Sequence, residues 1–224
     1  MIFAIFSDLH DNGAGLRRVL RDAERMQADR LVCLGDVGHS VGLYADLAGR
    51  GIECTFGNWE VSGLQQMPTA TADWVGQWPA VIRGGHALFC HATPDLPAGV
   101  HTTVDAARFM DTVAGWHVLF PRLNRDEPAR WQALARLEVD GVQVAFHGHT
   151  HVQEAWAWLD DGTGMRHLRR SSAPAELVLE PGSAQAPSRH LIGVGSAGQP
   201  HDGPHPRYAL YDDVTGAVLL RQLN

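Results

Sequence analysis

Side chains that can bind metal ions recur at or just after the ends of apolar runs in this 224-residue chain. The densest group follows the run at 142–146, where His147, His149 and His151 alternate with glycine and threonine. Histidine is the commonest protein metal ligand, and three imidazoles are costly to bury without partners. The full set of candidate ligands after such runs is Asp8, His10, Asp36, Asn58, His91, His149 and His151.

Each of these residues also has a purely structural interpretation. Asp8 could cap a helix, Asn58 could belong to a turn, His91 could be a satisfied core histidine, and the histidines at 147–151 could lie on the surface. Their shared position after apolar runs favours one common site instead. Carboxylate, imidazole and amide ligands without a thiolate are typical of sites for Mn, Fe, Zn or Co, and unlike a cysteine-rich structural zinc site.

The elements that must position this set alternate along the first half of the chain. Apolar runs at 2–6, 30–34, 52–56 and 87–90 predict strands, and that at 142–146 predicts a buried one. Leu16, Val19 and Ala23 predict a helix after the first run, and Leu43 and Leu47 predict a second. Residues 61–78 predict short helices broken at Pro68. Such alternation predicts parallel strands, whose carboxyl ends meet at one edge.

A helical insertion is predicted at about 94–139. Thr102 and Asp105 have the spacing of a capping box, which predicts a helix through Ala106 and Phe109. Asp126 predicts the start of another helix with Trp131, Leu134 and Leu137 on one side. We expect this insertion to cover one rim of the cleft.

The second half predicts a mostly antiparallel region. Short apolar runs at 152–159, 164–168, 176–179, 191–194, 208–211 and 218–220 predict strands, and 160–162 has the composition of a hairpin turn. Residues 171–174 and 181–189 are expected to be flexible loops. Without a repeat or a long linker, residues 1–224 are predicted to form a single domain.

Composition narrows the class of protein. The formal net charge is -7, every basic residue is arginine, and no basic run stands out, so we expect no nonspecific nucleic-acid binding and no membrane binding. The three cysteines, Cys33, Cys54 and Cys90, are far apart in apolar runs, which predicts reduced thiols in a cytoplasmic protein. The apolar run at 2–6 is too short for a signal peptide or a membrane span.

The ordered motifs resemble those of a known family. Asp-x-His at 8–10, Gly-Asp at 35–36, Gly-Asn at 57–58, His91 and Gly-His-x-His at 148–151 resemble the calcineurin-like metallophosphoesterases. The Gly-Ser-x-Gly-Gln-Pro stretch at 195–200 is similar to a loop of the small bacterial and archaeal phosphodiesterase-like branch. The resemblance implies an α/β fold: a four-layer α-β-β-α sandwich with two mixed sheets and a dinuclear metal site at the strands' carboxyl edge.

The resemblance also implies roles for the ligands. One ion would take Asp8, His10 and His151, the other would take Asn58, His91 and His149, and Asp36 would bridge both. The cofactors implied are two divalent transition-metal ions, with Mn favoured and Fe, Zn, Co or Ni as alternatives. Asp36, Asn58 and His91 would be catalytic, and a metal-bridging hydroxide would attack the phosphorus atom in line.

Three positions depart from the family pattern. Trp59 stands where many members have a histidine that protonates the leaving group, so the acid for that step is unassigned. Asp11-Asn12 replaces Gly-Asn, and His201 replaces an arginine of the late loop. We therefore treat Asn12, Trp59 and His201 as candidate substrate-binding residues, with a turn or core role as the alternative for each.

The leading functional hypothesis is a phosphodiesterase for a small phosphorylated substrate, nucleotides included. A dinucleoside polyphosphate hydrolase is the second alternative. A protein phosphatase is third, because Asp36 is followed by Val-Gly-His-Ser and not by the pattern of that branch. A different class, a non-catalytic interaction scaffold of the same fold, is the remaining alternative. The sequence does not indicate an oligomeric state.

Overall fold

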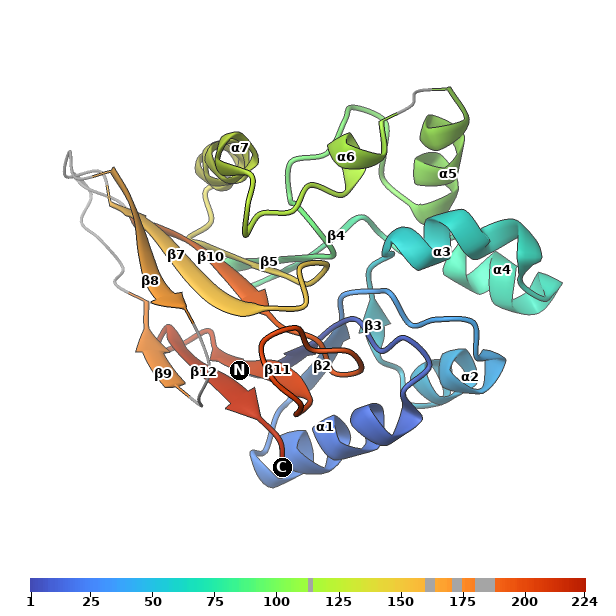
Figure 1. Ribbon diagram of the computed structural model, residues 1–224, viewed down its shortest axis with the longest axis horizontal. Helices are drawn as coiled ribbons and strands as arrows, with labels where there is room; N and C mark the ends of the chain where they lie inside the picture. The colour runs from blue at the N-terminus through green and yellow to red at the C-terminus, as the bar shows by residue number, and fades with distance from the viewer. Residues whose placement is uncertain (113–114, 160–163, 171–174, 180–187) are drawn as a thin grey trace.

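The computed structural model describes residues 1–112, 115–159, 164–170, 175–179 and 188–224. These residues form two six-stranded mixed sheets that lie between two groups of helices (Figure 1). The first sheet has the order β3 (Glu53–Cys54), β2 (Arg30–Cys33), β1 (Ile2–Phe6), β11 (Arg207–Asp212), β12 (Ala217–Gln222) and β9 (Ala175–Val178). The second has the order β4 (Val81–Gly84), β5 (Ala87–Cys90), β6 (Val144–His147), β10 (Ser188–Val194), β7 (Gln153–Leu159) and β8 (Gly164–Arg170).

Helices cover the outer face of each sheet. On the side of the first sheet lie α1 (Gly13–Arg25) and α2 (Val41–Gly49), and on the side of the second lie α6 (Trp116–Leu119) and α7 (Glu127–Val139) (Figure 1). The short helices α3 (Asn58–Gly63), η1 (Leu64–Gln66) and α4 (Thr69–Val75) lie beside α5 (Thr103–Thr112). The predicted four-layer α/β architecture with two mixed sheets is confirmed.

The alternation of side chains along the strands explains the layers. Phe3 and Ile5 of β1 point into the core between the sheets, whereas Ala4 and Phe6 join the core under α1 and α2. β1, β2 and β3 pair in parallel, as do β5, β6 and β10. Because parallel strands bring their carboxyl ends to one edge, the loops after β1, β2, β3, β5 and β6 can converge.

Aromatic rings hold the two sheets against each other. Phe3 and Tyr211 come from the first sheet, and Phe89 and Phe146 come from the second. Their ring centroids lie 5.1 Å apart for Phe3 and Phe89 and 5.1 Å apart for Phe146 and Tyr211. Each fully buried phenylalanine contributes about 1.5–3 kcal/mol relative to exposure, and aromatic pairing adds to this. This packing sets the distance between the carboxyl edges of the two sheets.

Most predicted elements are present, with some differences. Thr102 and Asp105 form the predicted capping box, with Thr102 N donating to Asp105 Oδ2 at 3.0 Å and Asp105 N donating to Thr102 Oγ1 at 3.3 Å. Asp126 caps α7 by accepting from Ala129 N at 3.0 Å, but Trp131 stays 38% exposed while Leu134 and Leu137 are buried.

Other boundaries differ because pairing partners decide them. The strand predicted at 52–56 is only Glu53–Cys54, where β2 offers a partner, and β4 and α6 were not predicted. β10 pairs in parallel with β6 and antiparallel with β7, so the second half is less uniformly antiparallel than predicted. The predicted turn at 160–162, the loop at 171–174 and most of the loop at 181–189 lie outside the described residues. In the described part of the chain, no helix is long and apolar enough to cross a membrane.

Candidate metal centre

The loops at the carboxyl edges of both sheets bring all seven candidate ligands together. Asp8 and His10 follow β1, Asp36 follows β2 and His91 follows β5. Asn58 comes after β3, and His149 and His151 come after β6. The described residues contain two groups whose ligand atoms lie close enough to hold an ion: Asp8, His10 and His151 in one, and Asp36, His91 and His149 in the other.

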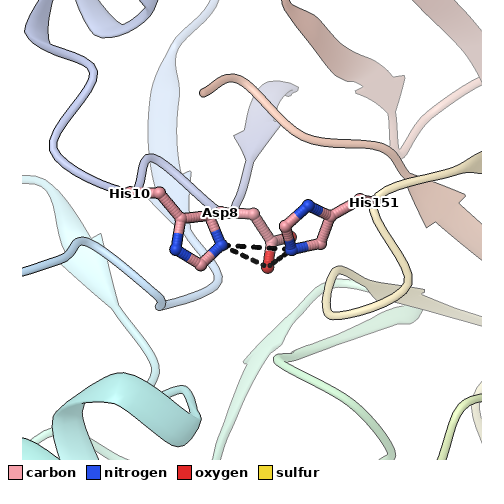
Figure 2. A group of neighbouring side chains, drawn as sticks. All are labelled: Asp8, His10 and His151. Atoms are coloured by element: carbon pink, nitrogen blue, oxygen red, sulfur yellow. Dashed lines mark hydrogen bonds and ion pairs between the residues drawn. The ribbon is translucent and has the colours of Figure 1, made fainter. Parts of the chain in front are cut away.

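The first group is built from one carboxylate and two imidazoles (Figure 2). Nε2 of His10 lies 3.1 Å from Nε2 of His151. Oδ1 of Asp8 lies 3.3 Å from Nε2 of His151 and 3.9 Å from Nε2 of His10. Asp8 is fully buried, and its Oδ1 accepts no hydrogen bond of ordinary geometry, while its Oδ2 accepts from His149 N at 3.0 Å.

The second group gathers around the side-chain oxygen of Asn58. Oδ1 of Asn58 lies 3.1 Å from Nε2 of His91 and 2.9 Å from Nδ1 of His149. Oδ1 of Asp36 lies 3.5 Å from Nε2 of His91. Asn58 therefore stands with this group, as the sequence predicts.

Asp36 lies between the two groups. Its Oδ1 faces His91 in the second group, and its Oδ2 lies 3.8 Å from Nε2 of His10 in the first. The carboxylate is buried, and Trp59 N donates to Oδ1 at 2.9 Å. A bridging carboxylate needs this placement.

The hydrogen bonds of two histidines show that the donor set fits metal ions. Nδ1 of His91 donates to Leu34 O at 2.8 Å, and Nδ1 of His151 donates to Gln199 O at 2.7 Å. In a neutral imidazole the opposite nitrogen then carries a lone pair. That lone pair faces oxygen or nitrogen atoms at 3.1–3.5 Å in both cases, an arrangement that a cation stabilises. A backbone acceptor behind a ligating histidine is the usual arrangement at metal sites.

The backbone at the ligands is unusual. Five of the seven candidates have left-handed φ angles between 44° and 61°: Asp8, His10, Asp36, His149 and His151. Only Asp11 and Gln27 share this conformation among the other non-glycine residues that the structure describes. Each such residue costs of order 1–3 kcal/mol, and these conformations cluster at functional sites. The turns are shaped to aim side chains at the centre.

Glycines permit the close approach of these turns. A Cβ atom at Gly57 would lie 2.3 Å from Oδ1 of Asp36, and one at Gly148 would lie 1.9 Å from Oγ of Ser7. Both distances are impossible for a real side chain, so glycine is required beside the bridging carboxylate and at the start of the 148–151 loop.

Glu60 is a structural residue of the site that the sequence interpretation missed. Its side chain is fully buried and accepts from Asp36 N at 2.9 Å, Val37 N at 2.9 Å and Gly57 N at 2.7 Å. Tyr44 also donates its hydroxyl to Glu60 at 3.0 Å. The carboxylate therefore joins the turn after β2 to the turn after β3. The three-residue spacing from Gly57 to Glu60, typical of a helix start, was the available signal.

The loop at 195–200 supports the first group from behind. Ser196 donates its hydroxyl to Asp8 O at 2.7 Å and accepts from Gln199 N at 2.6 Å. Gly198 N also donates to Asp8 O at 3.0 Å. Because Gln199 O accepts from His151, this loop positions two ligands of one group.

The two carboxyls of the centre have opposite pKa shifts. Burial by itself raises the pKa of Asp8, but the close contact with His151 at 3.3 Å and the positive charges that His91 and His151 carry when protonated outweigh it and hold this pKa below its ordinary value. For Asp36, burial and the carboxyls of Glu60 and Asp8 act together and raise the pKa well above its ordinary value. Cations on both sides would favour the ionised form of Asp36.

Most of the imidazoles are kept neutral by burial. Burial lowers the pKa of His149 to about 3 and that of His10 to about 4, and it also lowers the pKa of His91. His151 is the exception: burial lowers its pKa, but the close contact with the Asp8 carboxylate at 3.3 Å outweighs burial and raises this pKa. Neutral imidazole is the form that binds metal ions.

The three candidate substrate residues have different surroundings. Asn12 caps α1, accepting from Gly15 N at 2.9 Å and donating to Gly198 O at 3.0 Å, so both ends of its amide have structural partners. His201 is exposed and stacks on His151 with ring centroids 4.4 Å apart. The half-buried Trp59 meets His10 edge-on at 5.1 Å.

The segment at about 94–139 brings two further side chains close to the candidate ligands. The ring of Phe120 lies 5.8 Å from that of His91 and 5.9 Å from that of His149. Arg122 is exposed, and its charge helps to lower the pKa of both His149 and His201. The segment from about 94 to 139 was expected to cover a rim, but the sequence did not point to these two side chains.

Comparisons with known proteins agree with this geometry. Residues 1–215 match the family model of the calcineurin-like phosphoesterase superfamily domain. Among curated proteins, the chain is similar to an uncharacterised protein of Methanocaldococcus jannaschii, with 24% identity over 232 residues that cover 95% of this chain and 83% of that protein.

Solved structures show the same fold. A metallophosphoesterase from Sphaerobacter thermophilus superposes with a TM-score of 0.71 at 20% identity, covering 100% of this chain and 89% of that one. A protein assigned by prediction as a diadenosine tetraphosphatase superposes with a TM-score of 0.50 at 15% identity, covering 100% of this chain and 94% of that one.

Proposed function

The chain belongs to the calcineurin-like phosphoesterase superfamily, and from this premise we propose that it is a dinuclear metal-dependent phosphodiesterase for small or nucleotide-type substrates. Membership makes the protein a metal-dependent phosphoric ester hydrolase. The proposal adds the second ion, the type of ester and the roles of individual residues.

One observation carries the proposal. The two oxygens of Asp36 face different groups of ligands, at 3.5 Å from Nε2 of His91 and 3.8 Å from Nε2 of His10. A single-ion site would leave one of these groups without a purpose. We assign Asp36 as the bridge, and assign the other ligands as Asp8, His10 and His151 for one ion and Asn58, His91 and His149 for the other.

The chain's own residues then have defined tasks. Two ions held by these residues would supply Lewis acidity and would make a water nucleophile available near neutral pH. Asn58 directs its Oδ1 toward His91 and His149, so its Nδ2–H group is the donor that we assign to a phosphoryl oxygen. We assign His91 and Asp36 a catalytic role because they would hold the metal ions whose positive charges act on the phosphate.

Trp59 limits which leaving groups suit the site. The indole N–H is too weakly acidic to serve as a general acid for a departing alkoxide, whereas general acid catalysis is typically worth roughly 10²- to 10⁴-fold. Good leaving groups such as nitrophenolate or the phosphate end of an anhydride need no such acid. We therefore expect a steep dependence of rate on leaving-group pKa in the wild type, and a shallower one in Trp59→His.

That leaving-group argument also supports the alternative of dinucleoside polyphosphate hydrolysis. Trp59 and His39 form an aromatic pair beside the first group, with ring centroids 4.5 Å apart. Such rings can stack on a base, and the anhydride bond of a dinucleotide releases a phosphate rather than an alkoxide. We rank this activity second, below phosphodiester hydrolysis.

We propose manganese as the native metal, and a cytoplasmic location. All donors are nitrogen or oxygen, which suits Mn and also Fe, Zn, Co or Ni. The cysteines Cys33, Cys54 and Cys90 are buried and unpaired, as expected for reduced thiols.

A metal assay and a substrate panel test the proposal together. Protein purified without chelator should contain close to two transition-metal ions and, with Mn²⁺, should hydrolyse bis(4-nitrophenyl) phosphate faster than 4-nitrophenyl phosphate. If the phosphodiesterase proposal holds, diadenosine polyphosphates should be hydrolysed at a rate between the rates of these two substrates. If the alternative holds, they should be hydrolysed fastest. Folded protein that binds no metal and hydrolyses nothing would favour the scaffold interpretation.

A further inference from the structure

A small cavity lies beside the candidate metal centre, outside the set of ligands. It has a volume of about 160 Å³ and is enclosed by the turn after β2, helix α2 and the α3–η1–α4 segment. Apolar groups dominate its walls. Its apolar and aromatic lining consists of Val41, Tyr44, Trp59, Met67 and Pro68, and the polar side chains of His39, Gln66 and Thr71 also line it.

Trp59 is the wall that the cavity shares with the metal centre. Its indole lines the cavity and also meets the ring of His10 edge-on, with centroids 5.1 Å apart. Its backbone N–H donates to Oδ1 of Asp36 at 2.9 Å. A group that enters the cavity therefore contacts the same indole that borders the first group of candidate ligands.

The walls of the cavity are held in place by hydrogen bonds. Some of these bonds involve residues that also support the metal centre. Tyr44 donates its hydroxyl to Gly38 O at 2.9 Å and to Glu60 at 3.0 Å, so this hydroxyl is already used. The turn that carries His39 is fixed by Asp11, whose Oδ1 accepts from His39 N at 2.8 Å. The cavity is thus a preformed space rather than a gap between mobile segments.

Its size and chemistry select one kind of occupant. An apolar cavity of roughly 150 Å³ can hold one benzene ring. A planar six-membered ring would pack against the indole of Trp59 and against the aliphatic side chains of Val41 and Met67. A charged group would lose hydration, and no charged side chain lines the cavity to compensate, whereas His39, Gln66 and Thr71 could each hydrogen-bond a polar atom on a ring.

We propose that this cavity binds a six-membered ring of the substrate, such as an aryl group or a pyrimidine base, while the phosphate of the same molecule lies at the metal centre. The proposal rests on the function proposed above, because it places the phosphate at the two groups of ligands. It narrows the substrate class to phosphoesters that carry a six-membered ring within reach of the cavity.

Gly63 offers a way to fill the cavity without disturbing the metal centre. It lies in α3 and lines the cavity, and a Cβ atom there would meet only Gln66 Oε1 and Met67 Cε, both at 3.9 Å. Gly63→Leu therefore introduces a side chain into the space with little strain. Gly49→Leu is the matched control, because Gly49 ends α2 with nothing within 4 Å of its Cβ position and does not line the cavity.

The experiment measures the affinity of phenyl phosphate and methyl phosphate for the Mn²⁺-loaded protein by calorimetry. Burial of a ring predicts that the wild type and Gly49→Leu bind phenyl phosphate at least about tenfold more tightly than methyl phosphate. Gly63→Leu should lose this preference while its affinity for methyl phosphate stays unchanged.

Each other outcome counts against a specific claim. If both ligands bind equally to the wild type, or if Gly63→Leu keeps the preference for phenyl phosphate, the cavity is not the ring site, although the proposed function stands. If neither phosphate binds the metal-loaded protein, the placement of phosphate at the metals fails, and both proposals fall.

Discussion

The two groups of candidate ligands share Asp36 but differ in charge and surroundings. The group of Asp8, His10 and His151 has a carboxylate of its own, and it borders Trp59 and the exposed ring of His201. The group of Asn58, His91 and His149 has only neutral ligands besides Asp36, and Phe120 covers its two imidazoles.

This difference indicates a division of labour within one centre. The first group can attract a cation with Asp8 alone, whereas the second depends on the shared carboxylate. The apolar cover of Phe120 keeps water from the second group and strengthens its electrostatic interactions. The exposed ring of His201 lies on the side of the first group, and we expect the substrate to approach the centre from that side.

Asp36→Asn should have the largest effect. It removes the shared negative charge, so the second group keeps only neutral ligands, while the first keeps Asp8. We expect phosphodiesterase activity to fall at least about 10²-fold and metal content to fall from two ions to one or fewer. Elemental analysis after dialysis measures the loss, with Asp46→Asn on the exposed face of α2 as the control. Two retained ions and normal turnover would refute the bridging assignment.

His149→Ala and His151→Ala separate the groups. Each variant should lose one ion and about 10²-fold in activity, because a centre with one ion lacks half of its charge. His149→Ala should hold its remaining ion more tightly than His151→Ala does, since the surviving group then contains Asp8. Competition with a fluorescent chelator gives the two affinities, and the reverse order would contradict the comparison.

The sequence was most informative about which candidate ligands lie together. All seven residues follow apolar runs, and a run that ends at the carboxyl edge of a parallel sheet has few other places to put a polar side chain. Boundaries such as the short strand Glu53–Cys54 depend on which neighbour offers a hydrogen-bonding partner, and local pattern does not contain that information.

The supporting residues were missed for a related reason. Glu60 acts on the turn at Asp36, which is 24 residues away. Phe120 and Arg122 reach the centre only because the segment that carries them packs beside the second sheet, and the local sequence does not determine this packing. Their types, a buried acid, an aromatic and an exposed arginine, occur throughout soluble proteins and give no signal without that packing.

Arg122→Ala should weaken substrate binding without removing metal. Arg122 O accepts from Arg125 N and Asp126 N, both at 2.9 Å, and this turn presents the side chain on the rim near His149 and His201. A hydrogen bond to a charged group is worth roughly 1.5–3 kcal/mol, so the affinity for inorganic phosphate should fall about tenfold. The exposed Arg125→Ala serves as the control. Equal phosphate affinity in both variants would exclude Arg122 from the site.

Phe120→Leu should have the smallest effect, confined to the second group. The change keeps an apolar cover but removes the aromatic contacts with His91 and His149, which are worth about 0.5–1.5 kcal/mol. The more weakly bound ion should therefore dissociate a few times faster, and the other ion should not. Stopped-flow mixing with a chelator resolves the two phases; equal acceleration of both would mean that the ring serves the whole centre.

The carboxylate of Glu60 also bears on how this part of the protein opens. It accepts the amide protons of Asp36, Val37 and Gly57, which belong to two separate turns. None of these amides can exchange its hydrogen with solvent until it leaves Glu60, and freeing one turn leaves a buried charge with fewer partners. The two turns should therefore open together as one cooperative unit, at nearly the same rate. The turn after β2 therefore cannot open while the turn after β3 stays ordered.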